Sequence, residues 1–185
     1  MKKYVFLIFL ILTISCQQKK ENGIDSIEVL YYNGQFNRAE AVYCKDIIYS
    51  QAIKDIYFEA LQDSTHVPQE AIILDTIISD KRVLHEIELE LGKQKNIIED
   101  YVDARMKCYI MREGGQVDSL CIGNNPIYAL YNNQPVKLSN KFAYLIRENC
   151  GFYKWFNIDM LKYFDELNDP SFEREKVISY AGEEY

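Results

Sequence analysis

One ten-residue stretch, VDARMKCYIM at residues 102–111, constrains the fold more than any other part of the chain. Apolar side chains occupy every second position from Val102 to Ile110, and mostly polar ones stand between them. Because side chains alternate between the two faces of a strand, this pattern predicts an antiparallel strand that is covered on one face. Gly114-Gly115 then turns the chain into a second predicted strand over 117–122.

The turn position sets an expectation for two cysteines. A two-residue turn at Gly114-Gly115 places Cys108 opposite Cys121 in a non-hydrogen-bonded pair, where Cα atoms approach to about 4.5 Å. That separation is at the short end of disulfide geometry. The hairpin therefore favours a buried Cys108–Cys121 disulfide, with Cys44 and Cys150 as a second pair. Free buried thiols that pack as small apolar groups are the alternative.

Further hairpins are expected on both sides of this one. Residues 27–32 read as a strand that ends at Asn33-Gly34, a strong hairpin signal, with 40–48 as the returning strand. Residues 71–74 form a short apolar run that fits either a strand or the approach to a helix. Asn132-Asn133 joins two short strands in a register that puts Ala129 opposite Val136 and Leu130 opposite Pro135.

Helices are expected where apolar residues recur at helical spacing behind a capping residue. The expected segments are 50–61 behind Ser50, 79–91 between Ser79 and Gly92, 139–150 between Ser139 and Gly151, and 158–167. No repeat or linker divides the chain after residue 24. We therefore expect one α+β domain over 24–185, a mainly antiparallel sheet of hairpins with three or four helices packed on one face.

The chain begins with a leader. A basic start is followed by the nine apolar residues 4–12, too few to span a bilayer, and this layout predicts a signal peptide over 1–15. The small residue Ser15 directly before Cys16 resembles the lipobox of bacterial lipoproteins, in which the cysteine sulfur is acylated. Polar residues 16–23 would then be a flexible tether. Ordinary cleavage near Ser15 is the alternative.

The charge balance excludes some partners. The whole chain has a net charge of −7, and removal of residues 1–15, which contain two lysines and no acid, leaves 19 basic and 28 acidic residues, or −9. Phosphates would repel such a surface, so we expect no nucleic acid partner and no basic membrane-binding face. Membrane attachment would depend on the lipid at Cys16.

Few residues are candidates for chemistry. Ser64 and His66 crowd together in Asp63-Ser64-Thr65-His66, which leaves an envelope hydrolase as an alternative, although a polar loop explains the same residues. The two histidines and the cysteine spacing predict no metal site and no cofactor. Tyr31, Tyr32 and Trp155 could form a binding surface for a protein or a glycan, against the alternative that they belong to the core and its rim.

The chain resembles the small uncharacterised lipoproteins common in Bacteroidota. The resemblance rests on Ile27-Glu28-Val29, the "DARMKCYI" strand, "VDSLCI" and the asparagine hairpin before a helix, and spans residues 24 to about 150. It implies a lipid anchor in the outer membrane of the bacterial envelope and no activity that can be carried over. We expect a non-catalytic binding protein with a protein partner in the envelope, such as a toxin or envelope enzyme that it neutralises.

Overall fold

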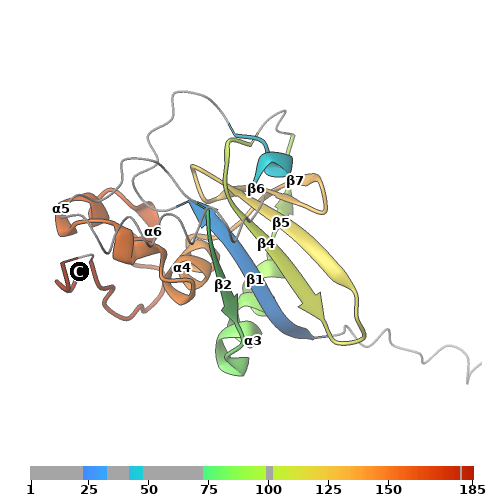
Figure 1. Ribbon diagram of the computed structural model, residues 1–185, viewed down its shortest axis with the longest axis horizontal. Coiled ribbons are helices and arrows are strands. Elements are labelled where there is room, and N and C mark those ends of the chain that lie inside the picture. Colours follow the sequence, from blue (N-terminus) through green and yellow to red (C-terminus); the bar gives the residue numbers. More distant parts are fainter. Residues whose placement is uncertain (1–22, 33–41, 48–72, 99–101, 180) are drawn as a thin grey trace, which may run out of the picture.

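The sheet organises the whole molecule. The computed structural model describes residues 23–32, 42–47, 73–98, 102–179 and 181–185. Within them lie a seven-stranded antiparallel sheet, of order β2-β1-β4-β5-β6-β7-β3, and four α-helices, which confirms the expected α+β class (Figure 1). The strands are β1 Ile24–Tyr32, β2 Ile73–Ile78, β3 Lys95–Asn96, β4 Ala104–Arg112, β5 Val117–Gly123, β6 Tyr128–Tyr131 and β7 Gln134–Lys137. The helices are α3 Lys81–Leu91, α4 Asn140–Asn149, α5 Ile158–Leu161 and α6 Asp165–Asn168, with 3-10 turns η1 Cys44–Asp46 and η2 Phe152–Trp155.

The neighbours of β1 differ from the expectation. β1 pairs with β2 on one side and with β4 on the other, so the apolar run at 71–74 leads into a strand. The predicted returning strand over 40–48 is wrong, because its described part, 42–47, contains the turn η1. Asn33-Gly34 and the predicted helix over 50–61 lie outside the described residues.

The β4–β5 hairpin has a three-residue loop instead of the expected two-residue turn. The Arg112 N–H donates to the Gln116 carbonyl at 2.8 Å, and Gly114 and Gly115 between them have φ values of 98° and 85°, which favour glycine. Cys108 consequently faces Leu120, and Cys121 faces Lys107. A register change of one residue moves a side chain to the other face of the sheet, so the expected Cys108–Cys121 pairing is wrong.

The β6–β7 hairpin follows its prediction. Asn132 and Asn133 have φ values of 48° and 63°, as a two-residue turn between strands requires. Asparagine tolerates this left-handed conformation better than most residues. Ala129 pairs with Val136 and Leu130 with Pro135, in the expected register.

The helix ends show the capping chemistry in detail. The Ser139 hydroxyl accepts from the Phe142 N–H at 3.0 Å, and Gly151 follows α4 with a φ of 75°, as predicted. α3 is capped by the carboxylate of Asp80 instead of Ser79, and Gly92 ends it in a right-handed conformation. The expected helix over 158–167 is divided into the short helices α5 and α6.

Both faces of the sheet bear apolar clusters. The larger core lies between the sheet and the helices, and includes Ile27, Met106 and Leu120 from the central strands. A smaller apolar cluster lies on the opposite face of the sheet. It contains Leu30, Val42, Ile47, Ala104 and Cys121. The helical layer therefore covers one face, as expected, while the segment around η1 covers part of the other (Figure 1).

The C-terminal segment is attached to the helical layer. The Glu175 N–H donates to the Tyr144 hydroxyl at 3.1 Å, and Val177 is fully buried. A short bridge between Ile178 and Glu184 turns the chain back, and Tyr185 packs against the core. Figure 1 shows α5, α6 and the C-terminus gathered at one end of the molecule.

Candidate binding groove

Several residues singled out in the sequence lie outside the described part of the chain. These are the lipidation candidate Cys16 and the hydrolase candidates Ser64 and His66. Within the described ranges, no three His, Cys, Asp or Glu side chains are placed to hold a metal ion. None of the helices described there is both long and apolar enough to cross a membrane.

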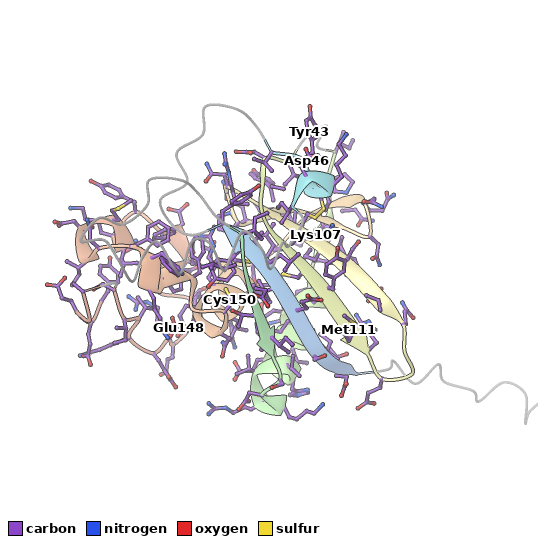
Figure 2. The ribbon with its side chains drawn as sticks, in the orientation of Figure 1. Tyr43, Asp46, Lys107, Met111, Glu148 and Cys150 are labelled. Carbon is purple, nitrogen blue, oxygen red and sulfur yellow. A yellow bond between two sulfur atoms is a disulfide. The ribbon has the colours of Figure 1, made fainter. Side chains whose placement is uncertain are left out.

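The disulfide joins Cys44 to Cys121 on the sheet face that the helices leave uncovered, with Cα atoms 5.9 Å apart. It holds the segment around η1 to β5. A backbone bond holds the same segment to β4, since the Ala104 N–H donates to the Val42 carbonyl at 2.9 Å. Lys107 and Met111 project from this face of β4, and Tyr43 and Asp46 mark the η1 segment (Figure 2).

The other two cysteines are buried free thiols, so the expected Cys44–Cys150 pair is wrong as well. Cys108 is fully buried, and burial raises the pKa of its thiol. Burial also raises the pKa of Cys150 to about 12. Both thiols therefore stay protonated and pack as small apolar groups, which was the alternative reading of the sequence.

The three candidate aromatic residues do not form one surface. Tyr31 is only 4% exposed, and its hydroxyl donates to the Cys150 carbonyl at 2.9 Å. Trp155 is partly buried against the same core. Tyr32 belongs to the smaller cluster on the opposite face of the sheet. The structure thus places Tyr31 and Trp155 together in the larger core and at its rim, and separates Tyr32 from them.

A groove of about 240 Å³ lies where α3, α4 and the C-terminal segment meet. Its lining is rich in ionic side chains, with an apolar and aromatic wall. The lining residues are Arg82, Val83, Glu86, Lys141, Tyr144, Leu145, Glu148, Asn149, Glu173, Arg174 and Glu175. Figure 2 labels Glu148 beside Cys150 at the end of α4, next to the C-terminal segment.

Helical spacing brings the α4 side of the groove together. Tyr144 and Leu145 each lie three or four positions from both Lys141 and Glu148, so the four residues share one side of the helix. Tyr144 and Leu145 are buried and form the wall. The Tyr144 hydroxyl also donates to the Glu175 carbonyl at 3.4 Å, which fixes the C-terminal segment as the far side of the groove.

The charged side chains of the groove differ in how they are paired. Lys141 forms a salt bridge of 3.1 Å with Glu86 of α3. The Arg174 guanidinium donates to two backbone carbonyls, those of Leu167 at 2.7 Å and Tyr185 at 3.3 Å. Salt bridges between described residues involve none of Arg82, Glu148, Glu173 and Glu175. Among the described residues these four groups thus carry their charges without a salt bridge.

Burial is the main cause of raised pKa values at two residues of the groove. Burial raises the pKa of Glu148, and the neighbouring Glu175 raises it further, against the opposing effect of Lys154. Burial and the charge of Glu148 likewise raise the pKa of Tyr144. Glu148 therefore lies in a partly desolvated position, and its charge acts on the Tyr144 hydroxyl.

The sequence predicted none of this groove. The local signal was the repeat of Lys141, Tyr144 and Glu148 on one side of a helix, beside the apolar stripe that marks the core. The acids at 173 and 175 lie in the charged C-terminal segment, about 25 positions after the α4 residues that they meet. No sequence pattern shows that this segment folds back onto α4.

Comparison with known proteins adds no relative. No protein-family model, curated protein or solved structure matches the chain. The fold and the groove thus define an α+β domain with a charged groove on its helical side.

Proposed function

We propose that this protein is a non-catalytic binding protein of the bacterial envelope, anchored through a lipid on Cys16, and that it engages a protein partner through the groove. One observation carries the proposal. Glu148, Glu173, Glu175 and Arg82 line a concave surface beside buried Tyr144 and Leu145, and no described residue forms a salt bridge with them.

Such a lining suits recognition of another protein. Apolar wall atoms supply contact area, and charged groups at the rim give orientation and specificity. The anchor would hold the domain close to the membrane, where the partner would be met. The predicted charge of the processed chain, −9, would favour association with a basic partner.

The anchor is tested separately from the groove. Cells that express the natural chain or Cys16→Ala are grown with a radiolabelled fatty acid, and the membrane fraction is collected. We expect the label and the membrane attachment with Cys16 and the loss of both in Cys16→Ala. A protein that stays in the membrane fraction unlabelled would contradict the proposed anchor.

The groove is tested by crosslinking in intact cells. A photoreactive amino acid replaces Glu173 at the groove or, as a matched acidic control, Asp159, whose side chain is 84% exposed on α5. We expect one discrete adduct from position 173 that is lost when Glu148 and Glu175 are both changed to Gln, and no such adduct from position 159. Equal labelling from both positions, or none from position 173, would remove the groove as the binding site.

A further inference from the structure

We infer that the groove binds the side chain of a lysine or arginine presented by a basic segment of the partner protein. The inference rests on the proposed function, because it specifies the chemistry that the same groove recognises. Three features of the groove support it: its unpaired carboxylates, its apolar wall and the way its C-terminal side is fixed.

The charges of the residues that line the groove indicate that the bound side chain is positively charged. Seven ionic side chains line the groove, four acidic and three basic. Lys141 is neutralised by its salt bridge with Glu86, whereas Arg174 donates to the neutral Leu167 carbonyl and keeps its positive charge. Arg82 and Arg174 then remain against the carboxylates of Glu148, Glu173 and Glu175, which leaves one negative charge in excess. A cationic guest removes this excess of negative charge.

The environment of Glu148 supports the same conclusion. Its side chain is partly buried at the end of α4, where desolvation disfavours the carboxylate. The nearby Lys154 lowers the pKa of Glu148 and Glu175 raises it by less, so burial is what keeps this pKa raised. A bound ammonium or guanidinium would stabilise both carboxylates.

The wall fits the rest of a long basic side chain. Val83 of α3 and Leu145 of α4 line the groove between its charged ends. Lysine and arginine bury their methylene stems along apolar surface while the charged head reaches polar groups. The groove offers both kinds of surface to one side chain.

The position of Glu175 is fixed by its backbone. Its N–H donates to the Tyr144 hydroxyl at 3.1 Å, and the same hydroxyl donates to its carbonyl at 3.4 Å. The carboxylate is therefore presented from a segment attached to α4. Preorganisation of this kind lowers the entropic cost of binding.

Peptide binding tests the inference. The acylated full-length protein, in neutral detergent, is titrated into a fluorescein-labelled peptide of lysine and serine, and binding is followed by anisotropy. Matched peptides carry norleucine or glutamate in place of lysine. We expect the lysine peptide to bind about fivefold or more tightly than the norleucine peptide, and the glutamate peptide to bind least. Equal binding of the lysine and norleucine peptides would overturn the inference.

Variants locate the binding. We expect Glu148→Gln and Glu175→Gln each to weaken lysine-peptide binding by about threefold to tenfold. Asp159→Asn, which removes the same charge from α5, should leave it unchanged. Glu175→Lys should shift the preference toward the glutamate peptide. An equal loss in Asp159→Asn would show a response to net charge alone and would contradict a guest held in the groove.

The two proposals fail in different ways. An adduct from position 173 in cells, together with equal binding of the charged and uncharged peptides, would contradict the inference of a cationic guest. The proposal that the groove binds a partner protein would be kept. Charge-selective peptide binding without the adduct would contradict the proposal that the groove binds a partner in cells. The inference that the groove binds a cationic side chain would be kept. Unfolding curves for each Gln variant show that its fold is intact.

Discussion

Asp118 of β5 accepts a hydrogen bond of 2.5 Å from the Arg112 guanidinium of β4, at the base of the hairpin between them. The Tyr131 hydroxyl and the Asn132 side chain donate to the same carboxylate at 2.7 and 3.0 Å. The pair therefore ties the β4–β5 hairpin to the turn of the next hairpin, at a position that is 2% exposed.

This network predicts acid sensitivity. Burial opposes the charged form of Asp118, but the hydrogen bonds, led by that of Arg112, lower its pKa to about 2. Since the pKa in the unfolded chain is about 3.9, the stabilisation is complete above pH 4 or so and is lost as the pH falls toward about 2. We expect Asp118→Asn to lower the free energy of unfolding by about 2 kcal/mol at pH 7 and by clearly less at pH 2.

Urea unfolding curves at several pH values measure both effects. The control is Asp159→Asn, whose largely exposed carboxylate should leave the pH dependence unchanged. A constant destabilisation by Asp118→Asn at every pH would mean that the carboxylate is not held in its charged form by Arg112.

A second prediction concerns the buried salt bridge between Arg147 and Glu166, whose side chains are 5% and 1% exposed. Arg147 also stacks on Phe152, with 4.7 Å to the ring centroid. Removal of one partner leaves a buried charge, so Glu166→Leu should cost about 3–5 kcal/mol of unfolding free energy. The double variant Arg147→Met with Glu166→Leu should recover most of that loss, because it restores an uncharged interior.

A double-mutant cycle in denaturant checks this prediction. The effect of each single variant is compared with that of the double variant under one set of conditions. Additive losses would show that the two side chains do not depend on each other.

The disulfide gives a third prediction. Cys44 and Cys121 are separated by 77 positions, so reduction restores considerable freedom to the unfolded chain. We expect the double variant Cys44→Ala with Cys121→Ala to lose about 2–4 kcal/mol of unfolding free energy. Cys44→Ala alone should lose a similar amount, because it already breaks the bond. The experiment compares thermal or urea unfolding with and without reductant, and the double variant should not respond to reductant.

The buried thiols give a fourth prediction. Burial raises the pKa of Cys108 and that of Cys150, the latter to about 12, so little reactive thiolate forms near pH 8. We expect both cysteines to resist alkylation in the folded protein and to react once it is denatured without reductant. Peptide mass spectrometry then finds the label at 108 and 150 and a peptide pair linked through 44 and 121. Rapid labelling of either thiol in the folded protein would contradict its burial.

The parts of the fold that the sequence predicted depend on local chemistry. The alternation in β4, the asparagine turn at 132–133 and the Ser139 cap each involve residues close together in the chain. Interactions of this kind leave their pattern in a single stretch, which is why these elements were placed correctly.

The predictions are wrong where contacts between segments that are distant in the chain determine the structure. Leu120, Cys121 and Ile122 are all buried, because the sheet is covered on both faces at this point. An apolar run of this kind gives no sign of which residue faces the helices, so the register and the cysteine pairing could not be predicted. The groove was missed for a similar reason, since residues 173–175 reach α4 only through the return of the chain.

The Cys44–Cys121 bond also changes the covalent connectivity of the molecule. Any single backbone cut between Cys44 and Cys121 leaves two pieces that remain one covalent molecule until the disulfide is reduced. If the domain is exposed to envelope proteases, as its proposed location implies, a nicked chain would keep β1 and β5 linked. On a gel, such a molecule would migrate as intact without reductant and as two fragments with it.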